Sequence, residues 1–253
     1  MLSIIIPVLN EASTIIDLLQ HLVNRSTPAN IADLIIVDGA SIDNTVHLIE
    51  SYAENQSALK IKVVQSEKGR AKQMNAGAAI ASGKVLYFLH ADSFPPAQFD
   101  QHILNEVKKG NPAGCFCMRF DSNHWWLRMA GWFTRFSWRA SRGGDQSQFI
   151  TKSLFNEIGG YDERYVIYED NILINALYAR NKYVVIPHWL TSSARLYEEK
   201  GVWYVQYHFL KIYIKRWQGA DASQLYAYYN AHIRQRMQSS CEDQKKSSEA
   251  FAE

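Results

Sequence analysis

The chain has 253 residues, a length that suits one α/β domain or two smaller ones. Hydrophobic residues make up 47% and charged residues 21%, which matches average globular usage and excludes a disordered, fibrous or collagen-like chain. With 27 basic against 25 acidic residues the net charge is +2, too small to predict sequence-independent binding of nucleic acid.

Cysteine usage and hydropathy bear on where the protein works. Cys115, Cys117 and Cys241 are too few for a disulfide framework and include no CxxC pair for a structural zinc, so a reducing compartment fits best. Apolar stretches such as residues 2–9 fall far short of the roughly 20 residues that a membrane span needs. The N-terminus also lacks the basic start of a signal peptide. We therefore expect a cytoplasmic protein.

The first hundred residues alternate between strand-like and helix-like patterns. The uncharged run over residues 2–8, with three consecutive isoleucines, is typical of a strand buried on both faces of a parallel sheet. Shorter runs predict strands over residues 34–37, 61–64 and 85–89. The intervening segments predict three helices: one capped by Asn10, one capped by Asp43 or Asn44, and one from Ala71 to a stop at Gly83. This order predicts an α/β fold with a parallel sheet.

The second half of the chain is less regular. Strands are predicted over residues 113–119 and 183–186, and helices over residues 125–139, 169–179, 201–217 and 223–234. The residues from 238 on are rich in Ser, Gln, Lys and Glu, with little to bury. We expect a single domain over residues 1–236 and a disordered tail over residues 237–253.

Polar residues follow several of the predicted strands. Asn10, Asp38, residues 66–70 and residues 90–92 all come directly after a strand, and ligands of open parallel sheets bind beyond those strand ends. The dinucleotide-binding GxGxxG, the P-loop and the GxSxG nucleophile motif are absent from the sequence. A nucleotide would therefore be held by isolated residues from different loops.

A series of short motifs carries a family resemblance. These are SIIIPVLNE at residues 3–11, IVDGASIDNT at 36–45, GRAKQMNAG at 69–77, LYFLHADS at 86–93, GDQ at 144–146, GGYD at 159–162 and ED at 169–170. In this order, over about the first two hundred residues, they resemble family 2 glycosyltransferases of the GT-A fold. Within the family the chain most resembles the small soluble bacterial branch associated with radical-enzyme gene clusters.

The resemblance implies a fold, an activity and a cofactor. The fold would be a mostly parallel central sheet flanked by helices, with further helices at the C-terminal end. The activity would be inverting transfer of a sugar from a nucleotide-diphosphate donor to an acceptor hydroxyl, assisted by a divalent metal, Mn²⁺ or Mg²⁺. The residues left two alternatives: a nucleotidyltransferase of the sugar-nucleotide pyrophosphorylase type, and an inactive module that retains only the nucleotide pocket.

The resemblance also implies a nucleotide-sugar site, made of Pro7, Asn10, Glu11, Asp38, Gly39, Arg70 and Asp92. Asp38 would accept a hydrogen bond from the base, and Arg70 suits the nucleotide because a guanidinium donates a planar fork to phosphate or carbonyl oxygens. Each residue also has a structural interpretation. Asp38 can form a turn before Gly39, and Asn10 can simply cap a helix.

The triplet His90-Ala91-Asp92 stands where the family usually shows Asp-x-Asp. Asp92 would be the metal ligand, because a hard divalent cation that also binds phosphate oxygens and water can need only one protein carboxylate. Packing under the nucleotide is the favoured interpretation of His90. For His188, in a region where some relatives supply another ligand, a structural role is favoured.

The pair Glu169-Asp170 resembles the acids that open a helix over the reaction centre. Asp170 would be the general base, with a pKa kept low by the helix N-terminus so that it acts chiefly by position. Asp145, Gln146 and Glu169 would lie on the acceptor side. The alternative is that the two acids only complement the helix dipole.

Two predicted helices combine aromatic and basic residues. The first carries Trp125, Met129, Trp132 and Phe136 on one face, and the second carries Trp203, Tyr207, Leu210, Ile214 and Trp217. Ordinary core is the favoured interpretation of the first helix, with an acceptor-pocket wall or a subunit contact as alternatives. Both helices leave open a peripheral contact with anionic lipid at the inner membrane face.

Overall fold

The computed structural model describes residues 1–143 and 146–234. Its contacts divide the chain into two compact units. The first unit contains residues 1–163 and 168–194, and the second contains residues 164–167 and the chain from residue 195 on. The single domain predicted over residues 1–236 stays a prediction, and the tail predicted over residues 237–253 lies outside the described residues.

The first unit is built on one eight-stranded sheet with the order β3-β2-β1-β4-β7-β6-β8-β5. The strands are β1 (Leu2–Val8), β2 (Ile31–Asp38), β3 (Ile61–Gln65), β4 (Val85–Phe88), β5 (Ser93–Phe94), β6 (Ala113–Phe120), β7 (Gln148–Thr151) and β8 (Val184–Ser192). β1 to β4 are parallel, as predicted. β7 is antiparallel to both β4 and β6, and β5 is antiparallel to β8, so the sheet as a whole is mixed.

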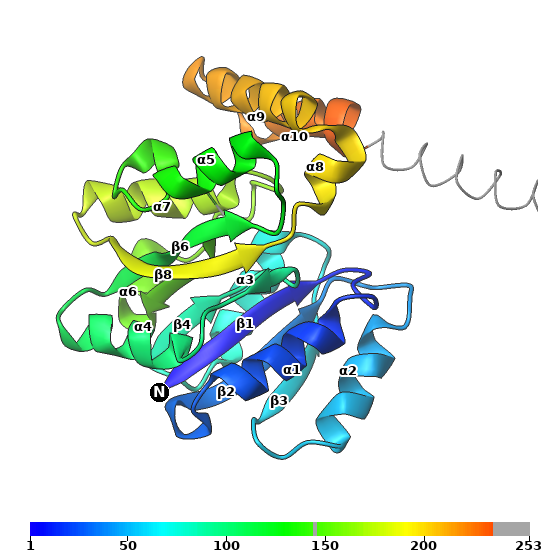
Figure 1. The fold of residues 1–253 in the computed structure, drawn as a ribbon, viewed down its shortest axis with the longest axis vertical. Helices are drawn as coiled ribbons and strands as arrows, with labels where there is room; N and C mark the ends of the chain where they lie inside the picture. The colour runs from blue at the N-terminus through cyan, green and yellow to red at the C-terminus, as the bar shows by residue number, and fades with distance from the viewer. Residues whose placement is uncertain (144–145, 235–253) are drawn as a thin grey trace, which may run out of the picture. The chain divides into compact units, whose positions relative to one another are not determined.

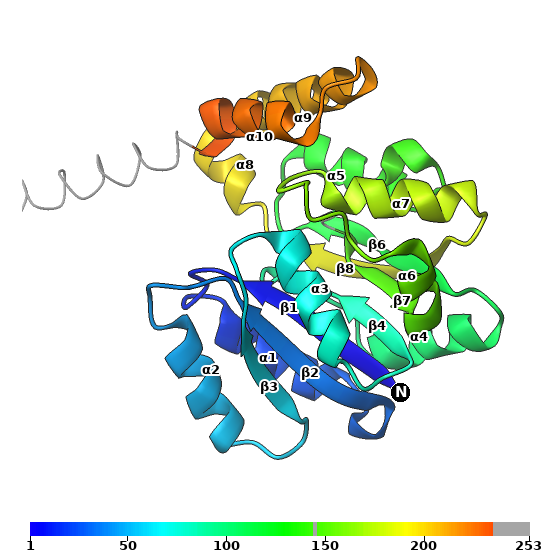
Figure 2. The same ribbon diagram turned by 180° about the vertical axis from the view of Figure 1, so that it is seen from behind.

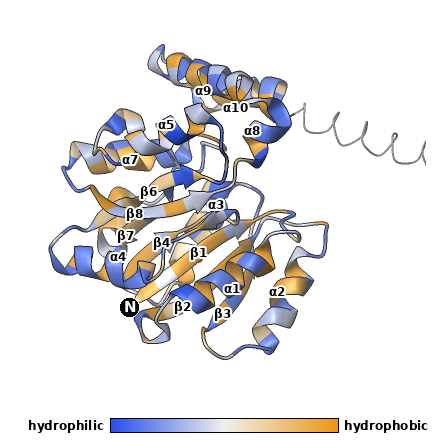
Figure 3. Ribbon diagram, in the orientation of Figure 1, coloured by the Kyte–Doolittle hydropathy of each residue, from blue (hydrophilic) through white to orange (hydrophobic). Residues whose placement is uncertain are grey.

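Helices cover both faces of this sheet, which is why its central strands β1, β2 and β4 are mainly apolar (Figure 3). The helices are α1 (Ile15–Arg25), α2 (Thr45–Glu54), α3 (Arg70–Ile80), α4 (Phe99–Lys108), α5 (Trp125–Phe133), α6 (Lys152–Ile158) and α7 (Glu169–Ala179). Alternate β1 side chains enter separate cores: Ile4 and Ile6 pack with residues of α1, α2 and α4, whereas Ile5 packs with residues of α3, α6 and α7. The two helix layers are seen from opposite sides in Figures 1 and 2.

Strand direction fixes where the polar loops meet. β1, β2, β3, β4, β6 and β8 all run the same way, while β7 runs the opposite way. The carboxyl ends of the first group and the start of β7 therefore lie at one edge of the sheet. That edge is where the sequence predicts ligand binding.

Several expectations about local structure need correction. Asn10 does not cap α1; the N-cap position is Thr14, and Asn10 instead takes a left-handed conformation with φ 57°. The helix expected over residues 125–139 ends at Phe133. Its aromatic face is not core, since Trp125 and Trp132 are exposed and only Leu127 and Gly131 are buried. The helices α4 and α6 were not expected from the sequence.

The second unit is helical. Its elements are α8 (Arg195–Lys200), α9 (Val202–Trp217), α10 (Ala222–Tyr229) and a π-helical turn, η4 (Asn230–Arg234). Asp221 forms a capping box with Gln224 that starts α10. Buried His208 accepts or donates a hydrogen bond with the Tyr228 hydroxyl at 2.8 Å, which ties α9 to α10. Within the described residues, no helix is long and apolar enough to cross a membrane.

A buried carboxylate holds together the sheet edge opposite the predicted site. Asp33 of β2 is fully buried and bonds Lys62 Nζ at 2.7 Å, the Ser82 hydroxyl at 2.6 Å and the Ser3 hydroxyl. Burial alone would raise the pKa of Asp33, but these hydrogen bonds outweigh it and lower that pKa below its ordinary value of 3.8. The ionised carboxylate therefore joins β1, β2, β3 and the start of β4.

Asp33→Ala is expected to lower the free energy of unfolding by roughly 3 kcal/mol at neutral pH, because it removes the acceptor from buried Ser3, half-buried Lys62 and exposed Ser82. Since the pKa of Asp33 is depressed in the folded protein, its contribution is present above the ordinary value and is lost as pH falls through the folded value. Denaturant unfolding at pH 7 and at about pH 2.5, which lies below the ordinary pKa of 3.8, measures both effects. The exposed acid Glu50, replaced by Ala, is the matched control; equal losses in the two variants would contradict this account.

Candidate active site

The loops after β1 and β2 are joined by hydrogen bonds. The Asn10 backbone N–H donates to the Ser41 hydroxyl at 2.9 Å, and the Ile42 N–H donates back to the Asn10 side-chain oxygen at 2.8 Å. The Glu11 N–H donates to the Thr45 hydroxyl at 2.8 Å. The Asn10 side chain thus fixes one loop against the other. Pro7 lies beside Val37 in the same strand pair.

Asp38 ends β2 as a buried carboxylate that shapes its own loop. Its oxygens accept from the N–H groups of Ala40 and Ser41, each at 3.2 Å, which is the turn-forming role considered from the sequence. Gln73 of α3 is also buried and donates to the Val8 and Val37 carbonyls at 2.9 and 2.8 Å. A Cβ at Gly39 would lie 2.9 Å from Gln73 Nε2, so glycine is required at this contact.

Backbone strain is concentrated in these loops. Non-glycine residues with positive φ include Asn10, Ala40, Ser147 and Tyr168, all in loops at this sheet edge or immediately before α7. A left-handed conformation is costly for residues with a side chain and persists where the surrounding structure imposes it. The strain is consistent with loops shaped for binding rather than for stability.

Arg70 brings the start of α3 to the start of α7. Its Nη1 lies 3.5 Å from Glu169 Oε1 and 3.9 Å from Asp170 Oδ2. The Glu169 side chain is only 1% exposed, and that of Asp170 is 12% exposed, whereas Arg70 is 47% exposed. One half-exposed cation therefore faces two carboxylates that the fold has largely removed from water.

Burial raises the pKa of Asp170 above its ordinary value of 3.8, and the Arg70 guanidinium only partly opposes that rise. The prediction that the helix N-terminus keeps this pKa low is therefore wrong. Desolvation outweighs the helix dipole here because the carboxylate has little contact with water. A carboxylate with raised proton affinity is a better base than an exposed one.

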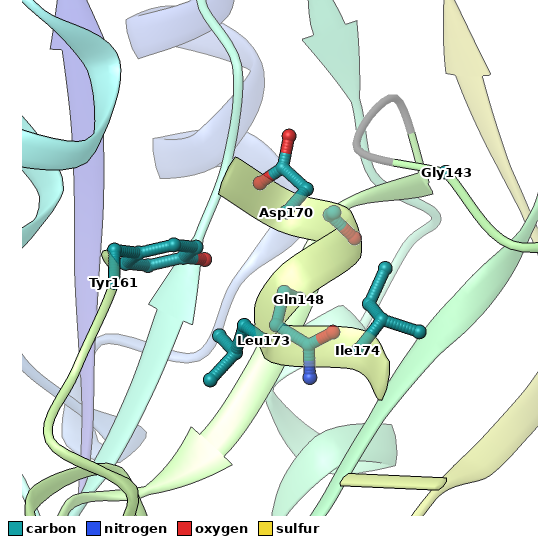
Figure 4. A pocket seen from close by; sticks show the side chains of 7 residues that line it. Gly143, Gln148, Tyr161, Asp170, Leu173 and Ile174 are labelled. Carbon is teal, nitrogen blue, oxygen red and sulfur yellow. The ribbon is translucent and has the colours of Figure 1, made fainter. Parts of the chain in front are cut away.

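A small pocket opens beside Asp170 (Figure 4). It is lined by Gly143, Ser147, Gln148, Tyr161, Asp170, Leu173 and Ile174. Tyr161 is 3% exposed and its ring lies beside α7 in the figure, while burial and the neighbouring carboxylates raise its pKa so that the hydroxyl stays protonated. Among the described residues, Tyr161 Oη and Gln148 Oε1 are buried without a hydrogen-bond partner. Both residues line the pocket, so a hydroxyl that can donate and an amide oxygen that can accept are left unsatisfied there.

Sequence reasoning missed Tyr161, Gln148 and Gln73 as contributors to this site. Tyr161 lies within the GGYD motif and Gln73 within GRAKQMNAG. These motifs indicated the family, but they did not show which of their residues contribute to the site. Nothing in the sequence around Gln148 distinguishes it from an ordinary strand residue.

Gln146 and Glu169, which the sequence predicts on the acceptor side, are not among the residues that line this pocket. Gln146 is 4% exposed; its amide donates to the Ser141 carbonyl at 2.6 Å and accepts from Arg142 at 2.7 Å. Buried Arg142 also donates to the Phe136 carbonyl at 2.7 Å, so this network holds the loop before β7. The Gln146 side chain is engaged inside the loop. Asp145 lies outside the described residues.

His90 and Asp92 follow β4 at the same sheet edge. Burial, together with the nearby Arg70 charge, lowers the pKa of His90 to about 3, so its imidazole is neutral near pH 7. No group of three or more His, Cys, Asp and Glu side chains that could hold a metal is found among the described residues. One half-buried carboxylate beside a neutral imidazole fits a divalent cation that takes its other ligands from a diphosphate and water.

His188 lies within β8, four residues before the end of the strand, where the pairing with β6 is irregular. Its ring stacks on His102 of α4 with 3.8 Å between the centroids. This arrangement agrees with a structural role.

With this geometry in place, comparison with known proteins identifies the family. The model of the family described as glycosyl transferase family 2 matches residues 3–180, more than half of the chain. The chain belongs to this family and is a glycosyltransferase. This assignment favours glycosyl transfer over the nucleotidyl transfer that the sequence had left open.

Individual relatives agree. The Escherichia coli K12 protein named as uncharacterized glycosyltransferase YibD is 25% identical over 239 residues, which cover 83% of this chain and 68% of YibD. The PGL/p-HBAD biosynthesis glycosyltransferase of Mycobacterium bovis BCG is 30% identical over 176 residues, covering 67% of this chain and 66% of its own length.

Solved structures show the same GT-A fold. A Staphylococcus aureus TarS fragment in complex with UDP has a TM-score of 0.61 at 18% identity, covering 76% of this chain and 60% of the fragment. The Pyrobaculum calidifontis mannosyltransferase PcManGT, in complex with GDP-Man and Mn²⁺, has a TM-score of 0.60 at 18% identity, covering 92% and 70%. The chain thus spans less than two thirds of the TarS fragment.

Asp170→Asn is expected to stabilise the protein at neutral pH. For an acid whose pKa is raised in the folded state, wild-type stability falls as pH rises from the ordinary value through the folded value, and asparagine removes that loss. Denaturant unfolding at pH 7.5 and at pH 3.5, which lies below the ordinary pKa of 3.8, should show a larger advantage for the variant at pH 7.5. If Asp170→Asn is less stable than wild type at pH 7.5, while the exposed-residue control Glu54→Gln is unchanged, the burial argument is wrong.

Proposed function

We propose that this glycosyltransferase moves a sugar from a nucleotide-diphosphate donor to an acceptor hydroxyl with inversion at the anomeric carbon, and that Asp170 is the general base. The observation that carries the proposal is the position of Asp170: a largely buried carboxylate beside Arg70, at the rim of a pocket with a hydroxyl donor and an amide acceptor. All of these groups belong to the first unit.

The proposed reaction is a single displacement. The acceptor oxygen forms a bond to the anomeric carbon while the bond from that carbon to the diphosphate oxygen breaks, and the leaving diphosphate takes the electron pair. The acceptor proton passes to the Asp170 carboxylate. Burial supports this role, because it raises the proton affinity of Asp170 toward the range useful to a base, while Arg70 favours the ionised form that must be present before transfer.

Pro7, Asn10, Glu11, Asp38, Gly39 and Arg70 are proposed to form the nucleotide side of the site. Asn10 and Asp38 would act largely by shaping the loops, since their side chains already bond to backbone N–H groups there. Asp92 would hold a divalent cation, with the neutral His90 beside it. When bound to the donor diphosphate, such a cation supplies positive charge that offsets the charge developing on the leaving group.

The acceptor side is proposed to be the pocket below Asp170. A substrate hydroxyl there would accept from Tyr161 and donate to Gln148, which would satisfy both buried groups. Glu169 would orient Arg70 rather than contact the acceptor, because its carboxylate is buried against that guanidinium. Gln146 would hold the loop before β7.

Asp170→Asn is expected to lower turnover at least about 10²-fold, because it removes the proton acceptor. The measurement is release of nucleoside diphosphate from UDP-glucose, UDP-GlcNAc and GDP-mannose, together with the dissociation constant of the diphosphate. The constant should be unchanged, and Glu54→Gln should behave as wild type. Wild-type turnover in Asp170→Asn would exclude this base. Diphosphate binding without turnover by the unmutated protein would instead favour the inactive nucleotide-binding module.

Asp92→Ala is expected to weaken diphosphate binding in the presence of Mn²⁺ by about tenfold or more, because it removes the proposed protein carboxylate on the cation. Without metal, variant and wild type should bind alike. Calorimetric titration measures both conditions, with the exposed α1 acid Asp17 replaced by Ala as the control. An unchanged metal-dependent affinity in Asp92→Ala would contradict the metal assignment.

A further inference from the structure

An apolar stripe runs along one side of α9 in the second unit. Trp203, Tyr207, Leu210, Ile214 and Trp217 recur at intervals of three and four residues and are all exposed, by 36% to 87%. This spacing places them on one helix face about 21 Å long. Large apolar side chains that are exposed along a whole helix face mark an interaction surface.

The opposite face of α9 packs against the other helices of the second unit. Val205, His208 and Ile212 are buried on that side. His208 bonds the Tyr228 hydroxyl of α10 and stacks on His232 of η4, and α9 also contacts α8. The exposed stripe is therefore not needed to build the core of its own unit, and it lies roughly half a helical turn away from the residues that are.

The charges around the stripe have a single sign. α9 contains Lys211, Lys215 and Arg216 and has neither Asp nor Glu. Lys211 lies over the Tyr207 ring at 5.5 Å, which holds that cation beside the stripe. The other two cations lie away from the stripe, since Lys215 is over the Tyr228 ring of α10 at 5.1 Å and Arg216 is over the Tyr165 ring at 5.8 Å. Over its described residues the second unit has seven Lys and Arg against three Asp and Glu, a net charge of +4, whereas the whole chain has +2.

Three features of α9 select among possible occupants. A face of another protein would need only shape and apolar contact, whereas this face combines apolar residues with the flanking cation Lys211, on a helix that has no acid. Tryptophans stand at both ends of the stripe, and Trp and Tyr favour the boundary between lipid and water. At 16 residues with three cations, α9 suits a position in the plane of that boundary.

We propose that α9 binds the surface of an anionic lipid bilayer, with the stripe inserted at the headgroup level and Lys211 against the lipid phosphates. The proposal is independent of the reaction at Asp170, because it requires neither donor nor acceptor. Its consequence for the enzyme is that the acceptor is met at a membrane surface.

Vesicle sedimentation with the full chain tests the proposal. The protein should sediment with vesicles of phosphatidylcholine and phosphatidylglycerol, bind pure phosphatidylcholine at least about tenfold more weakly, and be released as salt rises. Trp203→Ala/Leu210→Ala/Trp217→Ala should abolish sedimentation. Lys211→Gln should weaken binding to these vesicles about fivefold, because one cation near an anionic surface contributes about 1 kcal/mol. Circular dichroism and unchanged diphosphate binding establish that each variant is folded.

Trp138→Ala is the matched control, because Trp138 in the first unit is 57% exposed and Trp203 is 56% exposed. It should sediment as wild type; an equal loss of binding would show that any exposed tryptophan suffices and would overturn the assignment to α9. Binding that is equally strong on neutral vesicles would also overturn it. So would a failure to sediment combined with a dimer in light scattering that the triple variant converts to monomer, since the stripe would then be the contact between two copies.

Discussion

The site depends on one electrostatic interaction, in which the positive charge of Arg70 offsets the negative charges of two largely buried carboxylates, Glu169 and Asp170. α7 begins with Glu169 and Asp170, and the fold removes both from water; Arg70, from the start of α3, is the cation within 4 Å of each. A buried carboxylate without a nearby cation would take up a proton and lose its function as a base. Because α3 follows β3 and α7 follows β7, this contact joins segments about one hundred residues apart in the sequence.

The rest of the sheet edge supports that contact. Gln73, one turn into α3, bonds the ends of β1 and β2, so the helix that carries Arg70 is anchored to the strands that carry Asn10 and Asp38. The cost of this arrangement is visible in the left-handed residues of these loops and in the raised pKa of Asp170. Asp33 lies toward the other end of β2, and its pKa is shifted in the opposite direction. Its hydrogen bonds outweigh desolvation and lower the pKa, so its ionised carboxylate stabilises the fold.

Much of this arrangement was predictable from the sequence, because apolar runs are strong signals for buried strands. β1, β2, β3, β4 and α7 lie where the periodicity placed them, and the motif order indicated the family. The antiparallel direction of β7 between β4 and β6 was not predictable, since the pattern of a four-residue strand does not set its direction. The pKa of Asp170 was predicted in the wrong direction because burial depends on packing by distant residues. The exposure of the α5 aromatic face could not be predicted from the sequence. Residue spacing shows which side chains share one face of a helix, but not whether another part of the protein covers that face.

The most direct test of this account is a pH titration of the Asp170 carboxyl. Carbon-13 NMR would monitor the titration in selectively labelled wild type and in Arg70→Met. The account predicts that the pKa of Asp170 lies above 3.8 in the wild type and rises further when the arginine charge is removed. Asp170→Asn assigns the resonance by its disappearance. A carboxyl that titrates at or below the ordinary value, or that is unaffected by Arg70→Met, would contradict the claim that burial and Arg70 together set the proton affinity of the base.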